Sequence, residues 1–124
     1  MKREKDILQT GVIIHENGEV LVGKLAEGAQ YAGFWEFPLA DTVRQTMGVE
    51  VTKNEAPYDE VIYETDRKTI VKTNYLATIR SGTPKNDATY DAVRWIPVDV
   101  LRDVEWTPVD EGTVTKLLID GLGF

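Results

Sequence analysis

The sequence predicts a single α+β domain over residues 1–124, an α/β/α sandwich built around a mixed β-sheet. Strand-like segments come first, one short helix follows, more strands come next, and a helix closes the chain. A chain of 124 residues is long enough to bury a core of its own. The expected elements, in order, are strands at 7–15, 20–24 and 34–37, a helix at 40–47, strands at 58–65, 69–80 and 93–97, a helical turn at 97–101 and a helix within 108–122.

Turn residues and apolar spacing justify the elements of the first half. Asn17-Gly18 tolerates the positive φ angles of a tight hairpin turn, so the first two strands pair with each other. The third strand stops at Pro38, which has no backbone N–H to donate. Val43 and Met47, four residues apart, predict a helix of about two turns that Gly48 ends.

The second half contains two long apolar segments, a polar loop at 81–90 and a closing helix. Pro97 begins the short helical turn, because proline suits the first position of a helix. In the closing helix, an apolar stripe is expected to pack on the sheet; it consists of Val114, Leu117, Leu118 and Gly121.

Composition excludes several classes of function. The net charge of −7 argues against a protein that binds the phosphate backbone of nucleic acid, which needs clustered Lys and Arg. The absence of cysteine excludes disulfides and thiolate metal sites, and His15 alone is little material for a zinc site. No signal peptide or membrane span is visible, so a cytoplasmic protein without membrane contact is expected.

Several segments, taken in order, resemble the Nudix (MutT-type) nucleotide pyrophosphohydrolases. The clearest is Gly33-Phe34-Trp35-Glu36-Phe37-Pro38. The other matching segments are residues 11–24, 48–51, 92–101 and 106–118. This resemblance covers nearly the whole chain and implies the Nudix sandwich, with a shortened first helix and a C-terminal helix.

The metal-binding signature of that family is missing. In the family, the proline is followed by Gly-Gly and by G-x5-E-x7-R-E-U-x-E-E-x-G-U, whereas here the segment from Pro38 to Gly48 is shorter by about a dozen residues. Thr42, Gln45 and Thr46 stand where the resemblance places catalytic glutamates. Neutral side chains cannot hold Mg²⁺ against a diphosphate or activate a water. The resemblance therefore implies that pyrophosphohydrolase activity and the metal site have been lost, and no cofactor is expected. A protein of this kind is expected to work by binding a nucleotide-like ligand or a protein partner.

Two alternatives stay open at this stage. Other acids could hold Mg²⁺ and give an active hydrolase if the fold brings them to the cleft; the candidates are Glu36, Glu60, Glu64 and Asp66. Alternatively, a segment after Pro38 could be absent from this sequence, although restoring it would not return the glutamates at positions 42, 45 and 46.

Four residues are candidates for binding a nucleotide-like ligand: Glu36, Asp110, Lys24 and Trp35. Trp35 could stack on a base or pack in the core, and Glu36, on the opposite side of its strand, could meet a ligand or solvent. Asp110 matches a base-recognising position of the family or acts as the charge at a helix N-terminus. Lys24 could meet a phosphate or lie on the surface. The shortened segment after Pro38 also leaves sheet uncovered, which predicts a homodimer.

Overall fold

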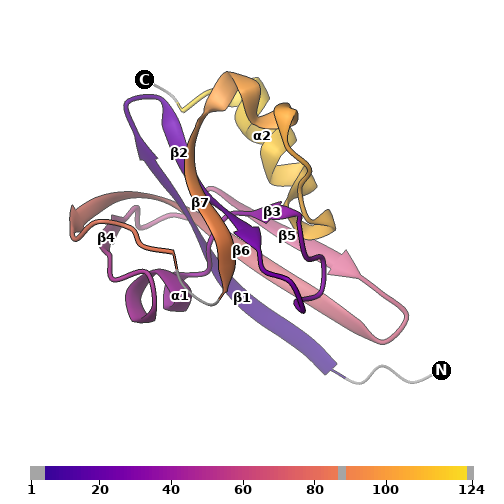
Figure 1. Cartoon of the computed structure of the whole chain (residues 1–124). Coiled ribbons are helices and arrows are strands. Elements are labelled where there is room, and N and C mark those ends of the chain that lie inside the picture. The colour runs from indigo at the N-terminus through magenta and orange to yellow at the C-terminus, as the bar shows by residue number, and fades with distance from the viewer. Residues whose placement is uncertain (1–4, 87–88, 123–124) are drawn as a thin grey trace.

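Strand β1 (Lys5–Glu16) is shared by both halves of the sheet in the computed structural model, which describes residues 5–86 and 89–122. Over residues 5–14 it pairs in parallel with β6 (Lys68–Ser81), and its end forms a hairpin with β2 (Glu19–Leu25). Asn17 and Gly18 have φ angles of 54° and 81°, as the predicted tight turn requires. Figure 1 shows β1 crossing the molecule beneath the other strands.

The remaining strands flank these three. Strands β4 (Glu50–Lys53) and β5 (Asp59–Glu64) pair antiparallel with successive parts of one edge of β6. Strands β3 (Trp35–Glu36) and β7 (Tyr90–Pro97) pair antiparallel with β2. The predicted mixed sheet is confirmed. Strand β4 was not predicted; with one apolar residue it has no strand pattern of its own, and it pairs because β6 is long enough to offer it an edge.

Two helices and two 3₁₀ segments complete the chain: α1 (Ala40–Gln45), α2 (Glu111–Asp120), η1 (Val98–Asp103) and η2 (Pro108–Asp110). Helix α1 ends two residues earlier than predicted, although Val43 and Met47 are both buried as their spacing indicated. The predicted stripe on α2 needs correction, because Thr113 is buried on that face while Leu118 is exposed. No helix in the described part of the chain is long and apolar enough to cross a membrane.

The sheet has a buried apolar cluster on each face, as the predicted sandwich requires. Ile13 lies in the cluster that packs against α2 and η1, whereas its neighbours Val12 and Ile14 lie in the cluster beneath α1. The helices therefore cover opposite faces, and Figure 1 shows α2 and α1 on different sides of the strands.

Candidate ligand-binding site

A completely buried ion pair ties the sheet to η2. The Lys72 ammonium on β6 lies 2.7 Å from the Asp110 carboxylate and also donates to the Phe37 carbonyl at 2.9 Å. The other Asp110 oxygen accepts from the Phe37 N–H at 3.3 Å and from the Thr107 hydroxyl at 3.0 Å. Each charge is thus paired and hydrogen-bonded, which a buried charge needs.

This pair anchors β3 and η2 side by side. Because Lys72 lies on the same face of β6 as Ile70 and Asn74, it points toward α2 rather than toward α1. Asp110 occupies the N-cap position of α2, but its carboxylate makes no capping hydrogen bond. Asp110 thus lies at the helix N-terminus, where a charge was predicted from the sequence, without forming a capping hydrogen bond. Because its carboxylate is completely buried, Asp110 acts through the elements it holds rather than by touching a ligand.

Glu36 lies beside this pair and reaches the surface. Its carboxylate accepts a hydrogen bond of 2.7 Å from the Tyr90 hydroxyl. Burial raises the pKa of the Glu36 carboxyl above its ordinary value, while the Lys72 ammonium and the Tyr90 hydroxyl offset part of that rise. The folded state therefore favours the protonated form of the Glu36 carboxyl more than water does.

Glu36 opens into a cavity of about 200 Å³, the Glu36 cleft, between β1, the loop at 26–34 and η2. Polar and charged side chains line it beside apolar ones; the lining is Ile7, Gln9, Leu25, Gln30, Tyr31, Glu36, Lys68, Ile70, Thr107 and Val109. Ligand cavities usually measure about 300–1,000 Å³. The Glu36 cleft is thus sized for a small ligand, or for one ring system of a larger one.

A second buried polar cluster lies further along β6. Asn74 donates to Asp59 at 2.9 Å and to Thr113 at 3.3 Å, and the Thr113 hydroxyl donates to Asp59 at 2.7 Å. The Asn74 Oδ1 is buried without a hydrogen-bond partner and faces Gly11, where a Cβ would lie 2.2 Å from it. The cluster joins β5, β6 and α2, and it does not line the Glu36 cleft.

The three positions at which the resemblance places catalytic glutamates lie on or just after α1. Thr42 is half-buried, and Gln45 and Thr46 are exposed. The Thr46 hydroxyl donates to the Thr42 carbonyl at 2.7 Å, so it is occupied by the helix end. Within the described residues, no three His, Cys, Asp or Glu side chains are grouped so that they could hold a metal ion. These residues do not fit Mg²⁺, which prefers carboxylate ligands.

The other two residues proposed from sequence lie outside the Glu36 cleft. Trp35 is buried in the core with the Arg94 guanidinium 5.5 Å from its ring centre, so it is not a surface on which a base could stack. Lys24 is half-buried on β2 and does not line the cleft. Phe37 packs in the core, stacked on Trp106 at 4.7 Å between ring centres.

Sequence reasoning missed most of the residues that build the site. Lys72 carries no local signal, because a lysine in an alternating strand ordinarily faces solvent. Gln9, Tyr31 and Lys68 line the cleft only because β1, the loop and β6 meet there. Glu36 was found because it alternates with two aromatic residues on a short strand.

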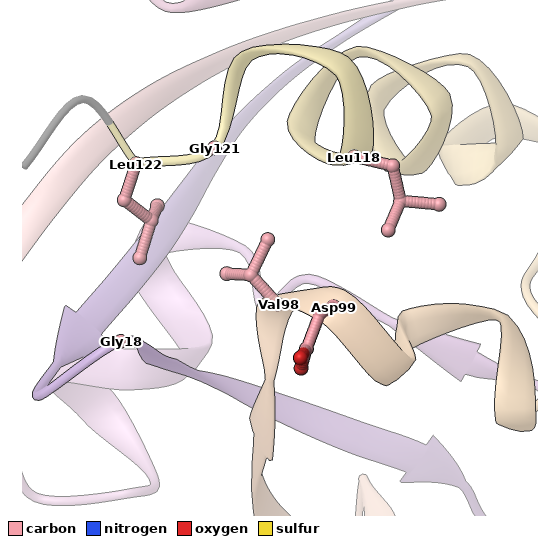
Figure 2. A pocket seen from close by; sticks show the side chains of 6 residues that line it. All are labelled: Gly18, Val98, Asp99, Leu118, Gly121 and Leu122. Atoms are coloured by element: carbon pink, nitrogen blue, oxygen red, sulfur yellow. The ribbon is translucent and has the colours of Figure 1, made fainter.

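A larger cavity of about 590 Å³ lies between the β1–β2 turn, η1 and the end of α2. Figure 2 shows Val98, Leu118 and Leu122 pointing toward one another, with the Asp99 carboxylate directed away from them. Among the described residues that line it, Asp99 is the single one with a charged side chain. This cavity lacks the converging polar groups of a ligand site.

Comparison with known proteins identifies the fold. No family model and no curated protein sequence matches the chain. Among solved structures, a MutT protein from Methanosarcina mazei Go1 superposes with a TM-score of 0.81 at 16% identity, over 98% of this chain and 99% of that one. The Escherichia coli ORF135 protein gives 0.78 at 18% identity, over 96% and 93% of the two chains.

A MutT protein of the Nudix hydrolase family from methicillin-resistant Staphylococcus aureus 252 gives a TM-score of 0.74 at 20% identity, over 97% of this chain and all of that chain. These likenesses extend over nearly the full length of both chains. The chain therefore has the Nudix fold.

Proposed function

We propose that this chain, whose fold is that of the Nudix hydrolases, binds a small nucleotide-like ligand in the Glu36 cleft without metal-dependent pyrophosphate hydrolysis. The observation that carries the proposal is the difference in side-chain chemistry between α1 and the Glu36 cleft. Helix α1 presents Thr42 and Gln45 where carboxylates would be needed, whereas the cleft has a carboxyl group, amides and a cation.

The chemistry of the cleft suits a heterocyclic ring with an anionic substituent. Ile7, Ile70 and Val109 offer apolar surface to a flat ring, and Glu36 and Gln9 offer hydrogen-bonding groups at its edge. A carboxyl group with a raised pKa can donate as well as accept, so it suits a ring edge that carries both kinds of group.

The anionic substituent of the ligand lies nearest the β5–β6 turn in this proposal. Lys68 and Gln30 line both the Glu36 cleft and an adjoining hollow of about 360 Å³, which also contains Arg67 and Asp66. Two cations beside one carboxylate favour a phosphate there. This places the phosphate away from α1, consistent with binding that needs no metal ion on that helix.

The test is a thermal-shift titration with nucleoside mono-, di- and triphosphates, oxidised dGTP, ADP-ribose and dinucleotides, each with and without Mg²⁺ or Mn²⁺. We expect at least one nucleotide to stabilise the protein equally in both conditions, by about 2.7 kcal/mol when its concentration is 100 times its Kd. Phosphate and pyrophosphate release are measured on the same samples.

Matched variants make the test specific. Lys68→Gln removes a cation that lines the cleft, and Lys24→Gln removes one that does not. The nucleotide shift should fall in the first variant and persist in the second. A shift that requires the metal and accompanies phosphate release would overturn the proposal in favour of a hydrolase with unusual carboxylates. No shift with any compound would overturn it as well.

A further inference from the structure

We propose that the face of β1, β5 and β6 opposite the Glu36 cleft is the interface of a homodimer. Three strands place their side chains there in register. Leu8, Val71 and Ile62 form one row across the strands, and Thr10, Thr73 and Glu60 form the next. We call the first row the apolar row.

The apolar row is exposed because α1 is too short to reach it. Leu8 is 80% exposed and Ile62 is 61% exposed, although both lie in the middle of paired strands. The residues that pack against α1 belong instead to the other half of β1, at Val12 and Ile14. Figure 1 shows the N-terminal part of β1 and the β5–β6 hairpin extending past α1.

A hollow of about 390 Å³ lies between the apolar row and α1. Leu8 and Thr10 form its sheet side, and Leu39, Ala40 and Thr42 form its helix side. The same face thus carries a projecting leucine and an adjacent recess. A two-fold axis can bring each Leu8 to the recess of the other copy, as a self-complementary interface requires.

The charges on this face support a second copy as the occupant. Glu60 and Glu64 flank Ile62 on β5, whereas Lys53 on β4 and the Arg44–Asp41 ion pair on α1 border the hollow. Strands β4 and β5 lie end to end along one edge of β6. A two-fold axis across the strands, in the plane of the interface, therefore lays the acidic β5 of each copy against β4 of the other, where Lys53 supplies an opposite charge.

A stable dimer needs enough buried surface and apolar anchors at its centre. Stable interfaces bury about 800 Å² on each partner. Two leucines and two isoleucines at the centre, each exposed by more than half in the single chain, are the apolar anchors that such an interface needs. The threonines and charges around them form a polar rim.

Sedimentation equilibrium over micromolar to hundred-micromolar protein tests the proposal. We expect a monomer–dimer equilibrium, and we expect Leu8→Ser to raise the dissociation constant at least about tenfold, since the change removes both central leucines. Ile119→Ser is the control, because Ile119 is 79% exposed on α2 and lies off this face. A monomer across the whole range would overturn the proposal, as would equal effects of the two changes.

Cross-linking tests the geometry. The chain has no cysteine, so a disulfide can form only between introduced residues. We mix equal amounts of Leu8→Cys and Ala40→Cys protein, oxidise with diamide and expect the disulfide-linked dimer of the two variants to exceed the sum of the two dimers that link like variants. Random pairing makes the mixed dimer only equal to that sum, and this result or a smaller share would contradict the arrangement. Neither experiment depends on the Glu36 cleft, so its result is independent of the nucleotide titration.

Discussion

At the scale of single residues, burial decides how much the loss of one partner of an ion pair lowers the stability of the fold. Lys72–Asp110 and Arg102–Glu111 have the same nitrogen–oxygen distance, 2.7 Å. The first pair is completely buried, and the side chains of the second are about half exposed. Removing one partner of a buried pair leaves a charge without compensation in the core, whereas water replaces the lost partner at the surface.

We therefore predict that Asp110→Asn lowers the free energy of unfolding by about 3–5 kcal/mol. The matched change Glu111→Gln should lower it by about 1 kcal/mol or less. Urea denaturation at pH 7 measures both. Adding Lys72→Met to Asp110→Asn should recover part of the loss, because the unpaired ammonium is then gone. Similar losses for Asp110→Asn and Glu111→Gln would contradict the role assigned to burial.

The individual residues that build the site were the hardest feature to predict from the sequence. Asp110 stood out by its position in a motif, but its partner Lys72 lies 38 residues away in an alternating strand. Nothing local distinguishes a lysine that meets a buried aspartate from one that meets water. Glu36 was recognisable because strand alternation is a local property.

At the scale of elements, the close approach of β1 to the polar groups of β6 depends on Gly11. A Cβ at this position would lie 2.2 Å from Asn74 Oδ1 and 2.7 Å from Lys72 Cε. Both neighbours are completely buried and hydrogen-bonded to other elements, so neither can move without breaking those bonds.

We predict that Gly11→Ala lowers the free energy of unfolding by about 1–3 kcal/mol, the usual range for overpacking a core. Gly112→Ala is the control, since a Cβ there meets nothing within 4 Å and alanine favours a helix. That change should stabilise the protein by up to about 1 kcal/mol. Thermal unfolding of both variants measures the difference, and a neutral Gly11→Ala would show that β1 and β6 can separate at this point.

Elements whose own residues show a regular apolar spacing or a turn signal were predictable from the sequence. Elements that form only through contacts with neighbouring elements were not. The hairpin at Asn17-Gly18 and the helix around Val43 follow from local residues. Strand β4 forms only because β6 extends beyond β5. Helix α1 ends two residues early because the Met47 N–H donates to the Thr42 carbonyl instead of to its helical partner at Val43.

At the scale of the whole molecule, the Nudix fold was predictable although its metal-binding signature is missing. The residues that define the fold are the apolar positions of the strands and α2, which pack on both faces of the sheet. Thr42, Gln45 and Thr46 are not part of either core cluster. The packing that specifies the sandwich therefore does not depend on which side chains stand at these three positions.

The pH dependence of folding is a property of the whole molecule to which Glu36 makes a distinct contribution. With a net charge of −7, the folded chain repels itself at neutral pH, and this repulsion weakens on acidification. Glu36 acts in the same direction. Its pKa is raised in the folded state, so the fold binds this proton more tightly than the unfolded chain does. The free energy of unfolding therefore falls as pH rises from 4.5, the ordinary value, through the raised pKa.

We predict that Glu36→Gln is more stable than the parent protein at pH 7.5 and that this advantage shrinks steadily as the pH is lowered toward 4.5. Glutamine has no charge to desolvate, and its carbonyl can still accept the hydrogen bond from Tyr90. Urea denaturation of both proteins at several pH values gives the difference directly, and subtracting the two profiles removes the contribution of overall charge. An advantage that grew on acidification would mean that the folded state favours ionised Glu36, contrary to its desolvated position beside the Glu36 cleft.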